Sequence, residues 1–223
     1  MNIVRLAAET DVLGAVDVQP TFMPGGELPV AGGETVVRAI NQLLAERFRH
    51  GFATQDWHPP GHVSFASSHP GRRAFETIRL PYGEQVLWPD HAVQGSPGAA
   101  LHPALDQRRI EMIVRKGFHA RIDSYSAFFE NDRVTPTGLE GWLRGRGFRR
   151  VFLAGLATDF CVAWSAEDAV RLGFETFVIE DASRAIAMDL PGGENSLDAA
   201  RRRLAALGVT FVPMDAVRAP AAG

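Results

Sequence analysis

The sequence predicts an α/β protein of three layers (α/β/α), in which helices cover both faces of a mostly parallel central sheet of about six strands. Two observations lead to this prediction. Apolar runs alternate with segments of helical periodicity along the 223 residues. The apolar runs are also continuous, as expected for strands that are buried on both faces of a parallel sheet. No linker-like stretch divides the chain, so we expect one domain over residues 1–223.

The first half of the chain supplies two strands, one helix and a long irregular segment. Residues 12–18 form a short, mostly β-compatible run and residues 51–58 predict a second strand. Residues 34–48 between them place apolar side chains at helical spacing. Residues 59–98 are rich in Pro, Gly and His, which predicts a long irregular loop. A loop of this length in a compact domain is more often functional than idle.

The second half alternates strands and helices more regularly. Further strands are expected at residues 111–117, 149–157, 174–180 and 209–213, and helices at residues 137–146, 159–173 and 194–207. Right-handed crossovers would connect the parallel strands. Open parallel sheets bind their ligands beyond the carboxyl ends of the strands, so we look for functional residues there.

The composition argues against nucleic-acid and membrane partners. The formal net charge is −3 and the arginine clusters are short, unlike the basic surface of a nucleic-acid-binding protein. No apolar run approaches the ~18 residues of a membrane span, and the N-terminus lacks the pattern of a secretory signal. The single cysteine cannot form an internal disulfide, so we expect a reduced, cytoplasmic protein.

The only cysteine, Cys161, lies in the segment LATDFCV between a predicted strand and a predicted helix. In the first turn of that helix, with Thr158 or Asp159 as the N-cap, unpaired N–H groups and the helix dipole would favour a nucleophilic thiolate. Taken alone, however, a lone cysteine is better interpreted as a small apolar residue that fills the core.

Two charged residues follow predicted strands at positions where burial is expected. Asp17 comes directly after LGAV, and Lys116 comes directly after MIVR. A loop-capping aspartate and a strand-end lysine that reaches water are the ordinary alternatives. Because the carboxyl ends of parallel strands meet at one edge, we expect both residues to converge with Cys161 as the base, cation and nucleophile of a cysteine hydrolase.

The segment TQDWHPPGHVSF contains a candidate metal site. Asp56 and His58 are two residues apart, so on an extended strand their side chains project to the same side. His91 supplies another imidazole, and one aspartate with two histidines can bind a metal ion while leaving positions open for water and substrate. His62 and Ser64 follow at loop distance. The alternative is a set of surface histidines in a polar loop.

Two aromatic residues accompany these groups. Phe22 lies in the loop after Asp17, and Trp88 lies three residues before His91. Ordinary packing explains either residue alone, but beside a metal and a thiolate the two side chains could sandwich a flat ring.

Five motifs together resemble those of the nicotinamidases in the isochorismatase-like hydrolase superfamily. In chain order they are DVQPTFMPGG, TQDWHPPGHVSFA, LWPDHAVQGSPGA, RKGFHARIDSYSAFFEN and GLATDFCVAWSAEDA, and the resemblance runs from about Asp11 to Ala182. It implies a Rossmann-like, isochorismatase-like fold. It also implies a metal-containing cysteine amidohydrolase of NAD salvage, which converts nicotinamide and water to nicotinate and ammonia through a thioester and also acts on pyrazinamide.

The resemblance assigns the catalytic roles. The catalytic triad would be Asp17, Lys116 and Cys161. The backbone N–H groups of Ala157 and Cys161 would form the oxyanion hole, and the peptide bond between Leu156 and Ala157 is cis in relatives.

The resemblance assigns the binding roles in the same way. Phe22 and Trp88 would flank the pyridine ring of the substrate. His62 and Ser64 are candidates for an additional metal ligand, because the family varies at that position. One divalent ion, commonly zinc, iron or manganese in the family, would be held by Asp56, His58 and His91.

The first motif departs from the pattern of many members, which have Asn-Asp where this chain has Pro20-Thr21. Pro20 would stiffen the loop that carries Phe22, so substrate breadth stays open. The alternatives in function are a related amidase or ureidohydrolase acting on a non-pyridine substrate, and a binding protein on a retired hydrolase scaffold. The expected partner is the small-molecule substrate, and a homo-oligomer is left open.

Overall fold

Six strands form a parallel sheet at the centre of the protein, whose computed structural model describes residues 3–190 and 192–221. Every neighbouring pair of strands in this sheet is parallel. The prediction of a mostly parallel sheet of about six strands is therefore confirmed, with strand bounds that differ by a few residues. In spatial order the strands are β6 (Ile110–Lys116), β3 (Gly51–Asp56), β2 (Asp11–Val16), β7 (Arg150–Leu156), β8 (Glu175–Arg184) and β9 (Thr210–Val212).

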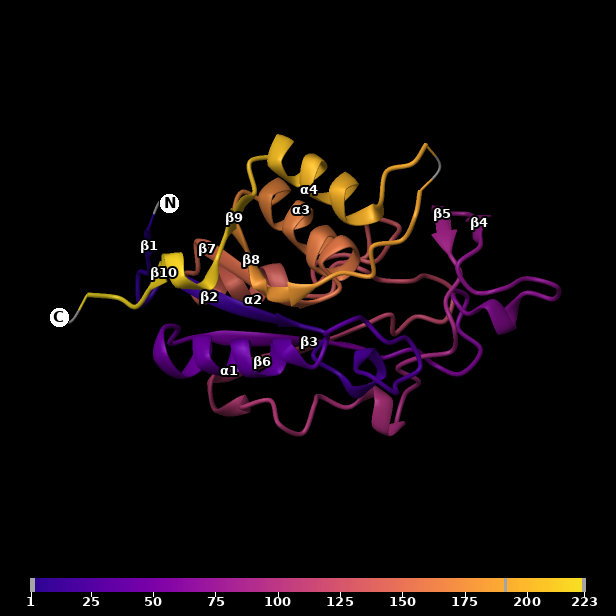
Figure 1. Cartoon of the computed structure of the whole chain (residues 1–223), viewed down its shortest axis with the longest axis horizontal. Coiled ribbons are helices and arrows are strands. Elements are labelled where there is room, and N and C mark those ends of the chain that lie inside the picture. Colours follow the sequence, from indigo (N-terminus) through magenta and orange to yellow (C-terminus); the bar gives the residue numbers. More distant parts are fainter. Residues whose placement is uncertain (1–2, 191, 222–223) are drawn as a thin grey trace.

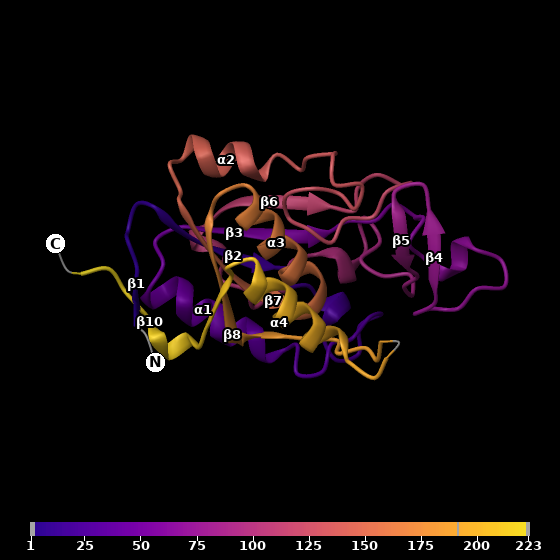
Figure 2. The same ribbon diagram turned by 90° about the horizontal axis from the view of Figure 1, so that it is seen from above.

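Helices cover both faces of this sheet (Figures 1 and 2). On one face lies α1 (Thr35–Glu46), whose apolar stripe includes the buried residue Ile40. On the other face lie α2 (Leu139–Gly145), α3 (Ala163–Arg171) and α4 (Ser196–Ala206). The predicted three-layer arrangement is confirmed.

The topology places a ligand crevice between β2 and β7. The crossover after β2 leads toward β3, whereas the crossover after β7 leads toward β8 in the opposite direction, so the carboxyl ends of these two strands flank the switch point of the sheet. The two strands approach closely there, because a Cβ on Gly155 (φ 126°) would lie 2.1 Å from the carbonyl oxygen of Val16. Glycine at position 155 thus lets the ends that carry Asp17 and Ala157 lie side by side.

Two short strand pairs lie outside the central sheet. β1 (Val4–Arg5) pairs with β10 (Val217–Arg218), and β4 (Thr77–Leu80) pairs with β5 (Gly83–Val86) in an antiparallel hairpin at the opposite end of the molecule (Figure 1). The prediction that residues 59–98 are irregular is wrong at this hairpin. Its strands are short and mostly not buried, so they lack the continuous apolar run that marks the central strands.

Short 3-10 turns connect several of these elements. None of the helices in the described part of the chain is both long and apolar enough to cross a membrane. The 3-10 turns are Pro20–Phe22, Ala66–Ser68, Pro97–Ala99, Gln107–Arg109 and Met214–Ala216.

Candidate active site

Lys116 is the centre of a buried polar cluster at the carboxyl ends of the strands. Its Nζ lies 2.8 Å from Asp17 Oδ2 and 3.3 Å from Cys161 Sγ. The same Nζ contacts Asp56 Oδ1 and donates a hydrogen bond of 3.1 Å to the carbonyl oxygen of Ser124. The structure therefore brings together the carboxylate of Asp17, the ammonium, the thiol and the candidate metal-ligand carboxylate of Asp56, which stand at or after the ends of four different strands.

Burial and mutual contact shift the pKa values in this cluster. Burial alone would lower the pKa of Lys116, but the carboxylates of Asp17 and Asp56 outweigh burial and raise the pKa well above its usual value, so Lys116 stays an ammonium. Burial raises the pKa of Asp17 despite the attraction of Lys116, which makes this carboxylate a stronger base than an exposed aspartate.

The helix start was expected to favour a thiolate at Cys161, but burial acts in the opposite direction. Burial raises the pKa of Cys161 well above its usual value, and the nearby charge of Lys116 does not offset this effect. A raised pKa favours the neutral thiol, which needs a base to become a nucleophile.

Thr54 holds Asp17 in an unusual backbone conformation. Asp17 follows β2 with a φ of 48°, in the left-handed region that non-glycine residues seldom adopt. Thr54 Oγ1 accepts a hydrogen bond of 3.0 Å from the Asp17 N–H and donates one of 2.5 Å to Asp17 Oδ1. These two bonds aim the carboxylate at the cluster, and Thr54 is a residue that the sequence analysis missed.

Cys161 lies in a π-helical turn, Thr158–Val162, that precedes α3. The prediction of a side-chain N-cap from Thr158 or Asp159 is wrong, because the N-cap position is occupied by Ala157 and has no side-chain hydrogen bond. The carboxylate of Asp159 instead accepts a hydrogen bond of 3.1 Å from the backbone N–H of Ile186. Asp159 thereby connects the segment after β8 to the π-helical turn that contains Cys161.

The predicted cis peptide bond between Leu156 and Ala157 is confirmed. Ala157 and Cys161 both line the same small pocket. The two residues expected to supply the oxyanion hole therefore border the place where a carbonyl group would meet the thiol.

Asp56, His58 and His91 turn their ligand atoms toward one another, with one atom of each within 4.8 Å of the others. His58 Nε2 donates a hydrogen bond of 3.0 Å to Asp123 Oδ1, which leaves the buried Nδ1 without a partner in the described part of the chain. His91 Nδ1 donates to the carbonyl oxygen of Pro89 at 2.8 Å, and its Nε2 lies 3.4 Å from Asp56 Oδ2. Two imidazole lone pairs and one carboxylate oxygen therefore fit a divalent metal ion.

His62 and Ser64 are placed beside this set rather than in it. His62 Nδ1 lies 2.7 Å from Ser64 Oγ, and its Nε2 lies 3.0 Å from the carbonyl oxygen of His119. Burial lowers the pKa of His62 to about 4, so the ring is neutral. With both ring nitrogens already hydrogen-bonded, His62 supports the loop and is not arranged as a ligand of the same ion.

A small pocket lies over Cys161 and the candidate metal ligands, and Phe22 and Trp88 both line it as predicted. The Trp88 ring packs edge-on against Phe160 with a centroid separation of 5.0 Å, and its Nε1 donates to Tyr125 Oη at 3.1 Å. A flat ring with a polar group at one end fits this lining. The apolar and aromatic lining residues that the sequence analysis missed are Leu28, Tyr125, Phe160 and Ile186.

The polar residues behind the pocket were also missed. Asp123 supports His58, and Gln85 on β5 contacts Asp123 in turn. The polar run IDSYS, which lies in the loop after β6, was the available signal for Asp123 and Tyr125, because it belongs to the motif that also contains Lys116. Gln85 gives no such signal, since its partners come from distant parts of the chain.

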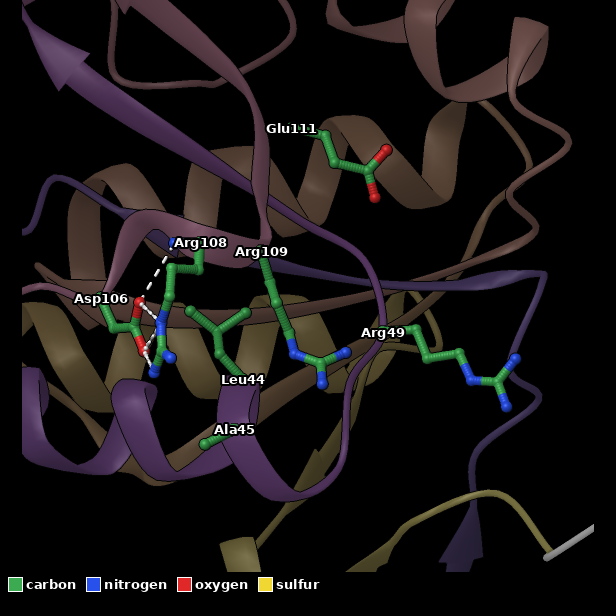
Figure 3. A pocket seen from close by; sticks show the side chains of 7 residues that line it. All are labelled: Leu44, Ala45, Arg49, Asp106, Arg108, Arg109 and Glu111. Carbon is green, nitrogen blue, oxygen red and sulfur yellow. Dashed lines mark hydrogen bonds and ion pairs between the residues drawn. The ribbon is translucent and has the colours of Figure 1, made fainter.

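Figure 3 shows a second hollow, at the amino ends of β3 and β6. Arg108 forms an ion pair with Asp106 inside it, and Arg49 forms one with Glu9. This hollow contains no nucleophile and lies at the end of the sheet opposite to the ligand crevice. We therefore place the active site at the pocket over Cys161.

Comparisons with known proteins agree with this geometry. The isochorismatase domain family matches residues 12–211. The chain is 52% identical over 202 residues to a nicotinamidase of Acinetobacter baylyi, covering 91% of this chain and 92% of the relative.

Solved structures lead to the same group. A nicotinamidase and pyrazinamidase from Acinetobacter baumanii superposes with a TM-score of 0.88 at 50% identity and covers 93% of this chain and 97% of its own. A pyrazinamidase of Pyrococcus horikoshii in complex with zinc superposes with a TM-score of 0.71 at 32% identity and covers 91% of this chain and 98% of its own.

Proposed function

The chain belongs to the isochorismatase family, and on this basis we propose that it is a nicotinamidase, which hydrolyses nicotinamide to nicotinate and ammonia. The observation that carries the proposal is the contact of Lys116 with both Asp17 and Cys161 beside a small aromatic pocket. The nicotinamidase and pyrazinamidase relatives support the same chemistry. Pyrazinamide, with the same carboxamide on a similar ring, is a second substrate, and the nicotinate product serves NAD salvage.

The first half of the reaction forms a thioester. Asp17 takes the proton of the Cys161 thiol, and the thiolate attacks the carbonyl carbon of the carboxamide. The carbonyl electron pair moves to the oxygen, which the N–H groups of Ala157 and Cys161 stabilise, each worth about 3–4 kcal/mol. The C–N bond then breaks and ammonia leaves with the proton that Asp17 held. Lys116 stabilises the negative charge that passes between Asp17 and Cys161.

The second half of the reaction releases nicotinate. Asp17 takes a proton from water as the water oxygen attacks the thioester carbon. The C–S bond breaks, the proton returns to the sulfur, and Cys161 is again a neutral thiol. The carboxylic acid formed in this step gives its proton to the released ammonia, so atoms and charges balance over the two halves as nicotinate and ammonium, and no redox partner is needed.

One divalent ion, zinc, iron or manganese, is proposed to be held by Asp56, His58 and His91. An ion bound there would supply a Lewis-acid site for the ring nitrogen of the substrate. Phe22 and Trp88 flank the ring. The unpaired Nδ1 of His58 and the zinc complex of the Pyrococcus horikoshii pyrazinamidase support this assignment.

Further properties follow from the same chemistry. The reaction depends on a reduced thiol, which supports a cytoplasmic location for the protein. The partner is a small-molecule amide, and we propose that residues 1–223 act as a single domain.

The proposal is tested by measuring ammonia release from nicotinamide under reducing conditions, before and after chelation. We expect turnover that falls on chelation and returns with added Zn²⁺, Fe²⁺ or Mn²⁺. Cys161→Ala should abolish turnover while still binding nicotinamide, with Cys161→Ser as a matched variant of nearly equal volume. Full turnover by Cys161→Ala would overturn the proposed mechanism. No turnover by the metal-replete wild type would overturn the proposed substrate and favour a non-pyridine amide.

A further inference from the structure

Gln85 on β5 has an amide group whose orientation is fixed by its neighbours. Its side chain is fully buried, and its Oε1 accepts hydrogen bonds from Tyr82 Oη at 3.0 Å and from Asn131 Nδ2 at 3.2 Å. Only the amide oxygen can accept from two such donors. The amide nitrogen therefore faces the other way, toward the active site.

From this orientation Gln85 Nε2 reaches two residues of the site. It lies 2.9 Å from Asp123 Oδ2 and 2.8 Å from Tyr125 Oη. Tyr125 Oη also accepts the hydrogen bond of Trp88 Nε1 at 3.1 Å. One buried amide thus joins the carboxylate behind the candidate metal ligands to the aromatic lining of the pocket.

Asp123 in turn determines which ring nitrogen of His58 carries the proton. Asp123 Oδ1 accepts hydrogen bonds from His58 Nε2 at 3.0 Å and from the Ser124 N–H at 2.9 Å. A proton on Nε2 leaves a lone pair on Nδ1, which is the form that a metal needs. Gly117 (φ 66°) leaves room for the ring in this position, since a Cβ there would lie 2.5 Å from His58 Nε2.

We propose that Gln85 and Asp123 are positioning residues that set the metal affinity of this protein, and that Gln85 also positions Trp88 through Tyr125. The β4–β5 hairpin, which carries Gln85, thereby couples the metal ligands to the ring-binding surface. This inference rests on the metal site of the proposed function and extends it to residues that touch neither the metal nor the substrate.

A second metal ion is the main alternative, because His58, His62 and Asp123 also offer ligand atoms within 4.8 Å of one another. However, the ligand atoms of His62 and Asp123 in this second group already form hydrogen bonds. Both ring nitrogens of His62 and both oxygens of Asp123 are hydrogen-bonded. The group is therefore arranged as a hydrogen-bonded support for one metal site.

The first test measures Zn²⁺ affinity by competition with a chromophoric chelator, which needs no substrate. We expect Gln85→Leu and Asp123→Ala to weaken zinc binding by about 10- to 100-fold. Asp123→Asn should lose less, because its amide oxygen can still accept the His58 proton. The matched control is Glu84→Gln on the same strand, whose exposed side chain contacts none of these groups and whose zinc affinity should match the wild type.

Two further measurements separate positioning from a purely structural role. Long-range ¹H–¹⁵N NMR of the metal-free protein should show His58 protonated at Nε2 in the wild type and a mixture of tautomers in Asp123→Ala. Tyr125→Phe should raise KM for nicotinamide in steady-state kinetics at saturating zinc. The same variant should keep the zinc affinity of the wild type in the chelator competition. Gln85→Leu should change both.

Unchanged zinc affinity in Gln85→Leu and Asp123→Ala would overturn the inference. So would a zinc content that falls from two ions per chain to one in Asp123→Ala, since Asp123 would then be a ligand of a second site. Circular dichroism checks that each variant folds. If Gln85→Leu does not fold, the zinc affinity of Asp123→Asn tests the inference instead. If the wild type fails to hydrolyse nicotinamide while the zinc pattern holds, the proposed function fails and the positioning role stands.

Discussion

The hydroxyl group of Thr54 offers a sharp test of how the catalytic base is held. Thr54 is fully buried, and Thr54→Val keeps the shape of the side chain while removing both hydrogen bonds to Asp17. A hydrogen bond to a charged group contributes about 1.5–3 kcal/mol, and the Asp17 N–H left without a partner costs about 1–3 kcal/mol. Because the two effects overlap, we expect the free energy of unfolding to fall by roughly 2–4 kcal/mol.

The same substitution should change the pH dependence of catalysis. The Thr54 hydroxyl stabilises the carboxylate form of Asp17 and so opposes the rise in pKa that burial causes. Asp17 must be ionised to accept the thiol proton, so loss of the hydroxyl raises its pKa further and moves the acidic limb of kcat/KM to higher pH. We also expect kcat to fall by about tenfold or more, which corresponds to about 1.4 kcal/mol of lost transition-state stabilisation.

Thr54→Ser is the matched control, because it keeps the hydroxyl and loses only one buried methyl group, at a cost of about 1 kcal/mol. Urea denaturation followed by tryptophan fluorescence measures stability, and ammonia release across pH 5–9 measures activity. The reasoning is refuted if Thr54→Val matches the wild type in stability and pH profile, or if Thr54→Ser is the more damaging of the two changes.

Three further substitutions test other parts of the structure. Lys116→Met leaves two buried carboxylates without their cation, so activity should be lost and the free energy of unfolding should fall by about 3–5 kcal/mol in urea denaturation. Gly117→Ala places a methyl group against the His58 ring and should weaken zinc binding in chelator competition. Burial raises the pKa of Glu130 above its ordinary value of 4.5, although its contact with His119 opposes the shift. Ionisation of Glu130 therefore destabilises the fold as pH rises, and Glu130→Gln should gain stability relative to the wild type between pH 4 and pH 7 in urea denaturation.

Each of these expectations has a clear contrary result. An active Lys116→Met enzyme would remove the lysine from the mechanism. Full zinc affinity in Gly117→Ala would mean that the His58 ring has room to move. A constant stability difference between the wild type and Glu130→Gln across the pH range would show that burial does not shift this carboxyl group.

The sequence predicted the sheet well because the signal for a buried parallel strand is local. The strands at the middle of the sheet, β2 and β7, carry continuous apolar runs that could be recognised one at a time. The β4–β5 hairpin was missed because its short, half-exposed strands are stabilised by pairing with each other and carry no such run.

The candidate catalytic residues could be predicted for a related reason. Asp17, Lys116 and Cys161 each stand at or just after a strand, and the parallel topology requires those strand ends to meet. The candidate metal ligands Asp56 and His58 share one face of an extended segment, which the two-residue period of a strand dictates.

The chemical state of the same residues was decided only by the tertiary structure. A helix start suggested a thiolate at Cys161, but burial raises its pKa and favours a thiol that depends on Asp17 as a base. The partners that matter lie far apart along the chain: Thr54 is 37 residues from Asp17, and Asp123 is 65 residues from His58. The sequence by itself determined the fold and the positions of the candidate reactive groups, because those follow from local periodicity and from strand order. The protonation state of Cys161, the tautomer of His58 and the hydrogen bonds that hold both catalytic and candidate metal-binding groups depend on burial and on contacts between distant segments. Only the folded chain brings these about.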